Sequence, residues 1–76
     1  MNWRDHIVKD PNVCHGAPTF RGTRVMVSSV LGYLAEGRGE NEVRKDFPSL
    51  GSESVRAALS FAAELADRER LLQDAG

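Results

Sequence analysis

The sequence of 76 residues has very little of the chemistry that small domains use for crosslinks or ion binding. Its one cysteine, Cys14, excludes an intrachain disulfide, and a lone thiol is typical of proteins in a reducing compartment. Cys14, His15 and His6 lack the spacing of metal ligands, so a packed or turn-lining role for the thiol is favoured over metal binding or nucleophilic catalysis. We therefore expect no metal and no cofactor.

The sequence also lacks a long apolar run. Its first residues, 1–6, are polar and do not resemble the apolar segment of a signal peptide or a membrane helix. No glycine-rich phosphate loop, serine nucleophile elbow or pair of catalytic carboxylates is found. These absences predict a cytoplasmic protein that makes no membrane contact and is not an enzyme.

Charge of one sign is scarce as well. The formal net charge of -1 differs from the basic balance that is usual for nucleic-acid-binding domains. Residues 1–45 carry seven Lys or Arg against five Asp or Glu (+2), whereas residues 46–76 carry three against six (-3). Any surface that binds DNA is therefore expected to be local.

Residues 1–27 are predicted to form an extended β-arm. Short β-prone runs at Ile7–Val8, Thr19–Phe20 and Val25–Val27 are separated by turns that contain proline or glycine. A two-stranded ribbon is marginal alone in water, and chains this short bury only about 60% of their unfolded surface, so we expect a homodimer. The residues predicted to build the arm and the dimer contact are Trp3, Ile7, Phe20, Arg21, Arg24 and Val25.

Two features of the arm leave alternatives open. Arg21 and Arg24 flank Gly22, and this turn could present two guanidinium groups to phosphates or carboxylates. The alternative is a solvated hairpin tip in which one arginine bonds backbone carbonyls. Trp3 fits either the apolar side of the ribbon within one chain or the seam of a dimer.

A three-helix core is predicted over residues 28–66, where the hydrophobic period changes from two towards 3.6. Ser28 supplies a residue of the N-cap type, and Gly37 can adopt the left-handed conformation that closes a helix. A second, short helix covers residues 40–46, because Pro48 disfavours a helical conformation in the residue before it.

The third predicted helix begins near Ser52 and continues past Arg68 into a helical extension over residues 67–76, since no glycine or proline interrupts it before Gly76. A helical wheel predicts a buried stripe of Val55, Ala58, Leu59, Ala62, Leu65 and Ala66. The residues predicted to face outward are Glu53, Arg56, Ser60, Glu64 and Asp67. The expected fold is a single, mainly α domain with a three-helix, helix-turn-helix (homeodomain-like) core and a short N-terminal β-arm.

A short middle helix and a long last helix fit the helix-turn-helix plan, in which the last helix enters the major groove of DNA. A three-helix bundle without any role in DNA binding fits the same spacing. Residues predicted to contact double-stranded DNA are Arg44 and Lys45 at phosphates and Ser52, Ser54 and Arg56 near bases. Of the residues predicted to lie near bases, Arg56 has the one side chain that could bond guanine through two donors.

Several short blocks carry a family resemblance. They are Asp10–Pro11, Cys14–Pro18, Arg21–Val25, Leu34–Gly37, Asp46–Leu50 and Val55–Leu59. In this order they resemble a bacterial and archaeal family catalogued as domain of unknown function 433, over residues 4–63. Ala17 stands where that family often has lysine, which removes one positive charge from the arm, and Gly51 stands where it often has a Ser or Thr cap. Glycine is still an acceptable N-cap.

The resemblance implies a winged or homeodomain-like helix-turn-helix fold and a role as the antitoxin of a pair whose toxin has a PIN-type nuclease fold. Such antitoxins commonly repress their own operon, so we expect an adaptor that binds a nuclease and, as a second ligand, its operator DNA. The alternatives are a helix-turn-helix transcriptional regulator without a toxin and a purely structural protein-interaction module. The residues expected to bind the protein partner are Arg68, Arg70, Leu71 and Leu72, where an arginine could block the acidic metal site of the nuclease.

Overall fold

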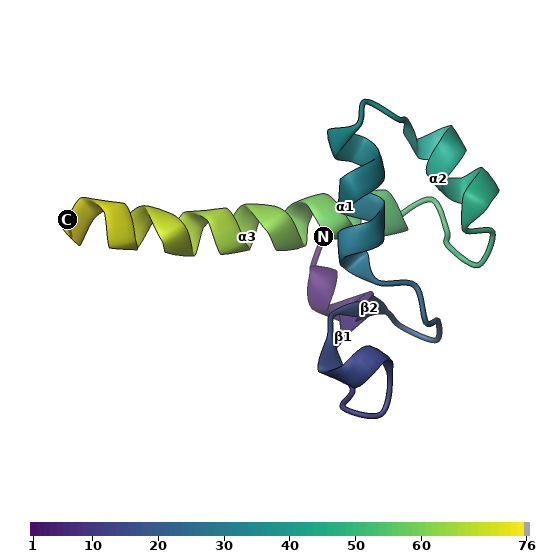
Figure 1. The fold of residues 1–76 in the computed structure, drawn as a ribbon, viewed down its shortest axis with the longest axis horizontal. Helices are drawn as coiled ribbons and strands as arrows, with labels where there is room; N and C mark the ends of the chain where they lie inside the picture. Colours follow the sequence, from purple (N-terminus) through teal and green to yellow (C-terminus); the bar gives the residue numbers. More distant parts are fainter. Residues whose placement is uncertain (76) are drawn as a thin grey trace.

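The computed structural model describes residues 1–75, and it describes side chains as far as Glu69. Along the chain the elements are η1 (Trp3–Asp5), β1 (Ile7–Val8), η2 (Cys14–Gly16), β2 (Thr19–Phe20), α1 (Val27–Ala35), α2 (Glu40–Asp46) and α3 (Ser54–Ala75). Here η denotes a short 3-10 turn. The fold is mainly helical, with three α-helices and a short two-stranded β-arm at the N-terminus, as predicted (Figure 1).

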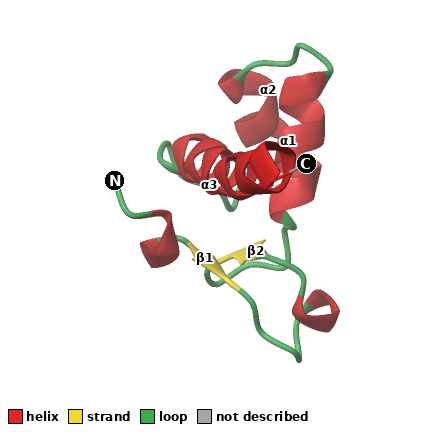
Figure 2. Ribbon diagram, turned by 90° about the vertical axis from the view of Figure 1, so that its left-hand side faces the viewer, coloured by secondary structure: helices red, strands yellow, loops and turns green. Residues whose placement is uncertain are grey.

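The core lies where α1, the first half of α3 and the arm meet (Figure 2). Its buried apolar side chains are Ile7, Phe20, Val27, Val30, Val43, Leu50, Val55, Ala57, Ala58 and Phe61. On α1 the predicted apolar face is confirmed, because Val27 and Val30 are buried and Leu31 and Leu34 pack against the core half-buried. Six of these ten side chains are valine or alanine.

The arm contains the two predicted strands but lacks the third. Ile7 lies opposite Phe20 in an antiparallel pair of two residues per strand. The predicted strand at Val25–Val27 is wrong, since Met26 makes only an isolated bridge to Thr19 and Val27 begins α1. Val27 is 1% exposed, so burial on the core side of the helix outweighs its local preference for extended structure.

Of the two ends of α1, only the N-terminal end differs from the prediction. The N-cap is Met26 rather than Ser28, and no side chain caps the helix. The backbone carbonyl of Pro18 accepts the Val27 N–H at 3.0 Å and so satisfies a donor of the first turn, which makes a serine cap unnecessary. Gly37 closes the helix with a φ of 85°, as predicted.

The predicted bounds of α2 are confirmed, and Phe47 leaves the helical conformation immediately after it. The start of α3 was predicted two residues too early, because the chain makes a tight turn before the helix. In this turn the Gly51 N–H donates to Ser54 Oγ at 3.1 Å, and the Ser54 N–H donates to the Gly51 carbonyl at 3.2 Å. The hydroxyl of Ser54 therefore accepts a hydrogen bond from a backbone N–H three residues earlier.

The buried side of α3 is rotated from the predicted stripe. Val55 and Ala58 are buried as predicted, but Ala57 and Phe61 are buried as well. The predicted members of the stripe that are instead exposed are Leu59, Leu65 and Ala66. The cause is the arm, because η1 packs against α3 and the ring of Trp3 meets Phe61 edge-on, with centroids 5.0 Å apart.

The arm also reaches further along α3. Arg4 Nη2 lies 2.9 Å from Glu64 Oε2, which joins η1 to the middle of α3. Glu64 and Ser60, both predicted to face outward, are half-buried. Contact with an element 60 residues away in sequence is invisible to a helical wheel.

The second half of α3 extends well beyond the rest of the protein (Figure 1). Every side chain described from Leu65 to Glu69 is exposed. The projection contributes to the elongated overall dimensions of 42 × 31 × 22 Å. Among the described residues no helix is both long and apolar enough to cross a membrane.

Candidate functional site

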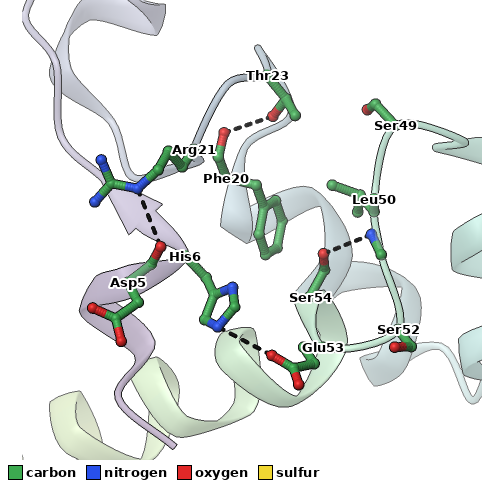
Figure 3. A pocket seen from close by; sticks show the side chains of 11 residues that line it. Asp5, His6, Phe20, Arg21, Thr23, Ser49, Leu50, Ser52, Glu53 and Ser54 are labelled. Carbon is green, nitrogen blue, oxygen red and sulfur yellow. Dashed lines mark hydrogen bonds and ion pairs between the residues drawn. The ribbon is translucent and has the colours of Figure 1, made fainter.

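A cleft of about 440 Å³ opens between the arm and the segment that leads into α3 (Figure 3). One wall comes from η1 and the β2 turn, including His6 and Thr23, and the other from residues 49–54. Phe20 and Leu50, which are both buried, form its apolar base. The cleft therefore joins segments that are far apart in sequence.

The polar groups of the cleft mainly hold its walls together. His6 Nε2 lies 3.3 Å from Glu53 Oε2 across the opening. Thr23 Oγ1 donates to the Phe20 carbonyl at 2.8 Å, and the Arg21 guanidinium turns away from the opening and donates from Nε to the Asp5 carbonyl at 3.1 Å (Figure 3). The Thr23 hydroxyl and the Arg21 guanidinium thus donate hydrogen bonds to carbonyls of their own chain. Arg21 follows the alternative in which one arginine of the turn bonds backbone carbonyls.

The residues predicted to contact DNA do not form one continuous cationic surface. Arg44 is exposed but lies 3.7 Å from Glu40 on the preceding turn of α2. Ser52 and Ser54 line the cleft. Lys45 and Arg56 are exposed and have no ion pair among the described side chains. Two of the five predicted positions therefore present an uncompensated charge to solvent.

The arm residues predicted for a dimer contact differ in how far they are buried. Ile7 and Phe20 are 4% and 3% exposed and belong to the core of their own chain. Trp3 and Val25 pack against that core half-buried. Arg24 is exposed. The apolar members of this set are thus largely occupied within one chain.

Of the residues predicted to bind a protein partner, Arg68 lies on the projecting half of α3 and pairs with Glu64 at 3.2 Å. The side chains of Arg70, Leu71 and Leu72 lie outside the residues whose side chains the structure describes. Their backbone belongs to α3.

Cys14 lies in η2, whose three residues have positive φ angles of 50°, 56° and 84°. Cys14 Sγ donates to the carbonyl of Arg24 at 3.5 Å, which ties this left-handed turn to the β2 turn. No group of three or more His, Cys, Asp or Glu side chains within the described part of the chain could hold a metal ion.

A polar cluster joins α1 to α2. The Tyr33 hydroxyl donates to Asp46 Oδ2 at 2.7 Å, and the Arg38 guanidinium lies over the Tyr33 ring at 4.4 Å. The hydrogen bond to Asp46 raises the pKa of Tyr33 above its ordinary value of 10.0, and desolvation and the Asp46 charge act in the same direction, while Arg38 opposes them. The cluster therefore joins α1 to α2.

Comparison with known proteins gives the family. The model of the family described as "Protein of unknown function (DUF433)" matches residues 7–62. This chain belongs to the DUF433 family. Those residues comprise most of the arm, all of α1 and α2, and the first nine residues of α3.

Two relatives support the assignment. The uncharacterized protein y4eO of Sinorhizobium fredii (strain NBRC 101917 / NGR234) is 33% identical over 73 residues, which are 93% of this chain and 33% of the relative. The chain thus spans about a third of the length of the curated relative it matches. The crystal structure of a DUF433 member from Anabaena variabilis ATCC 29413 superposes with a TM-score of 0.72 at 30% identity, covering 87% of this chain and 68% of that one.

In this DUF433 chain α3 carries two rows of apolar side chains that are partly exposed to solvent. We call them the inner and the outer seam. The inner seam follows Ala58, Phe61 and Leu65, and the last of these is 41% exposed. The outer seam follows Leu59 and Ala63, and Leu59 is 51% exposed. The predicted buried stripe combined Leu59 and Leu65, which lie on different sides of the helix. The 3-4 spacing within each seam was the available signal.

Proposed function

We propose that this DUF433 chain is an antitoxin-like adaptor that binds a nuclease through the inner seam of its projecting helix. The observation that carries the proposal is the position of Leu65. It lies four residues after Phe61 and seven after Ala58, on the side of the helix that buries both, yet it is 41% exposed because the body of the protein ends before it. A partner that continued the core along α3 would bury it.

The helix itself supports a docking role. A 22-residue helix is about 33 Å long at 1.5 Å per residue, and in its second half every side chain described, from Leu65 to Glu69, is exposed. Isolated helical segments shorter than about 12–15 residues are marginal in water. An amphipathic helix that lays its apolar seam into a groove of another protein is a common recognition mode.

The charge next to Leu65 suits a nuclease with an acidic metal site. Arg68 follows Leu65 at the seam spacing, and its guanidinium is held by Glu64 on an exposed surface. Exposed ion pairs of this kind contribute only about 0.3–0.5 kcal/mol, so Arg68 can exchange Glu64 for a partner carboxylate at little cost. The nuclease class rests on the family resemblance, and the docking surface rests on Leu65.

The outer face of α3 favours a protein partner over the major groove. A recognition helix presents polar and cationic side chains to bases and phosphates. After Arg56, this face exposes the apolar side chains of Leu59, Ala63 and Ala66, which cannot do so, and then the acidic Asp67, which would repel phosphates. DNA binding is therefore an added readout of the experiment below, not part of the proposal.

The proposal is tested by co-expressing the tagged chain with a PIN-type nuclease encoded beside its gene, then measuring complex formation by titration calorimetry and RNA cleavage by the nuclease. Wild type should bind and inhibit. Leu65→Asp should weaken binding by roughly 30-fold or more, as expected for a central apolar contact worth about 2 kcal/mol. Leu59→Asp changes an exposed leucine of the outer seam; it is the matched control and should bind normally.

If Leu65→Asp inhibits the nuclease as well as wild type does, the inner seam is not the docking surface. If the wild-type chain neither binds nor inhibits it, the adaptor role fails. Mobility-shift titrations on the upstream region of the gene, with Lys45→Ala as the charge control, would show whether DNA is bound instead.

A further inference from the structure

We propose that Arg4, near the N-terminus, positions the charged part of the docking surface on α3 and so favours a protein partner with an acidic side chain. The inference rests on the proposed function, because it concerns the residues beside Leu65. Arg4 and Arg68 both contact the carboxylate of Glu64, with Nη2 to Oε2 distances of 2.9 and 3.2 Å. We call these three residues the Arg4–Glu64–Arg68 cluster. It carries two positive charges and one negative charge.

This ratio of charges sets the cluster apart from the other ion pairs of the described side chains. On α2, Arg44 contacts Glu40 at the same spacing of four residues, but there one arginine meets one carboxylate. Arg38 contacts two carboxylates. Among the described ion pairs, two arginines share one carboxylate at Glu64 alone. The cluster therefore has one guanidinium more than its own carboxylate can neutralise.

The two arginines of the cluster are held differently. Arg4 donates to both oxygens of Glu64, with Nη1 to Oε1 at 3.4 Å and Nη2 to Oε2 at 2.9 Å, and its guanidinium lies 4.3 Å from the centre of the Trp3 ring. That ring in turn packs edge-on against Phe61. Arg68 donates to Glu64 from Nη2, at 3.2 Å. Arg4 is thus the fixed partner of Glu64, and Arg68 is the one that can turn towards another protein.

This difference matters when a partner binds. If Arg68 leaves Glu64 for a carboxylate of the partner, Arg4 still neutralises Glu64. Without Arg4, the same exchange would leave Glu64 as a bare carboxylate next to the incoming one, and the two like charges would repel each other. Arg4 therefore lowers the cost of releasing Arg68 and removes a repulsive charge from the docking surface.

The cluster is open to a partner that reaches Leu65. The side chains of Arg4 and Arg68 are 56% and 62% exposed, and Leu65 follows Glu64 directly. Such a surface fits an acidic side chain next to an apolar one, because a guanidinium binds a carboxylate through paired donors. It suits a nucleic acid less, since Glu64 and Glu69 would repel a row of phosphates.

The cluster is not part of the family likeness. All three of its residues lie outside residues 7–62, the range that the DUF433 model matches. We therefore expect the cluster to contribute to the choice of partner by this particular chain rather than to the common fold.

A rescue experiment separates this role of Arg4 from a purely structural one. Binding to the nuclease is measured by titration calorimetry, where Arg4→Gln and Arg68→Gln should each weaken it by about fivefold or more. Adding Glu64→Gln to Arg4→Gln should restore binding to within about twofold of wild type, because it removes the bare carboxylate and releases Arg68. Adding Glu64→Gln to Arg68→Gln should restore nothing. Arg44→Gln, which breaks a pair of the same spacing, is the matched control and should bind like wild type.

A second measurement does not depend on the nuclease. The blocked tripeptide Leu-Glu-Leu is titrated into the isotopically labelled full chain, and amide signals are followed by nuclear magnetic resonance. The signals of Arg4, Glu64 and Arg68 should shift saturably. The uncharged peptide Leu-Gln-Leu, or the Arg68→Gln variant, should raise the midpoint by about fivefold or more.

The two measurements fail separately. If Leu-Glu-Leu leaves the signals of the cluster unchanged, the cluster is not a carboxylate site and the proposal is overturned, whatever the nuclease does. A nuclease that binds Arg4→Gln as well as wild type, or that Glu64→Gln does not bring back, overturns the positioning role of Arg4. If the wild-type chain does not bind the nuclease, the adaptor role fails, and the peptide titration still decides whether the cluster binds a carboxylate.

Discussion

The two halves of α3 share a helical spacing of apolar residues but have different surroundings. In the first half, Ala57, Ala58 and Phe61 are buried by α1 and η1. In the second half, Leu65 repeats the same spacing in solvent. Helical periodicity therefore indicates which side of a helix can be buried. The contacts with the rest of the chain determine how much of the length of that side is buried.

The largest difference in stability is expected between two alanine substitutions, one in each half of α3. Phe61→Ala removes a buried ring and its edge-on contact with Trp3, and it should lower the free energy of unfolding by about 3–5 kcal/mol. Leu65→Ala should change it by less than about 0.5 kcal/mol, since the side chain is exposed. Urea denaturation followed by circular dichroism measures both. Equal losses would show that the chain covers Leu65 itself.

The second-largest effect is expected in the rate at which backbone amides of the two halves of α3 exchange with solvent. At low concentration and without a partner, amides of residues 58–62 should exchange with solvent only through global unfolding, and those of residues 68–75 through local fraying. For a protein stable by about 5 kcal/mol, the difference in rate is about a thousandfold or more. Hydrogen exchange followed by mass spectrometry measures it. Uniform protection along α3 would contradict the comparison.

A smaller effect is expected at the boundary between the halves, where Glu64 pairs with both Arg4 and Arg68. Arg4→Ala breaks the pair that joins two elements and removes a guanidinium 4.3 Å above the Trp3 ring. Because these side chains are partly exposed, we expect a loss of about 0.5–1 kcal/mol that high salt reduces. Arg68→Ala, which breaks a pair within one helix, should cost less. Thermal melts at two salt concentrations would reveal the opposite order if the arm is not anchored there.

The smallest effect concerns the joint between α1 and α2, which serves as a reference away from α3. The chain has one tyrosine, so its ultraviolet absorbance reports Tyr33 alone. Its ionisation midpoint should lie above 10.0 in the folded protein and return towards that value in Asp46→Asn. Since the folded protein holds this proton more tightly than the unfolded chain, its contribution to stability is full below pH 10.0 and is lost as the pH rises through the raised pKa. A midpoint that Asp46→Asn leaves unchanged would contradict the assigned cause.

Much of the architecture follows from local sequence signals. The strand pair at Ile7–Val8 and Thr19–Phe20, the bounds of α2 and the closure of α1 at Gly37 were all predicted and are confirmed. Each depends on residues a few positions apart. The N-cap of α1 and the missing third strand were predicted wrongly, because both depend on the carbonyl of Pro18 and on the burial of Val27, which come from tertiary packing.

The candidate surfaces were harder to predict. The predicted partner-binding end of α3 was chosen from its place in the sequence, and of its four residues the structure describes the side chain of Arg68 alone. The cleft between His6 and Glu53 could not be anticipated, because its walls lie 47 positions apart and no local motif joins them.

The amino-acid sequence by itself determined the family, the order of the elements and the long uninterrupted run of α3, because these depend on local propensities and short motifs. It also supplied both apolar seams of α3, since alanines and leucines recur there on more than one side. Only the tertiary structure decided which seam is buried. The physical reason is that Trp3 and Arg4, at the other end of the chain, contact Phe61 and Glu64. These contacts cover the inner side of α3, and Leu59 on the other side remains exposed.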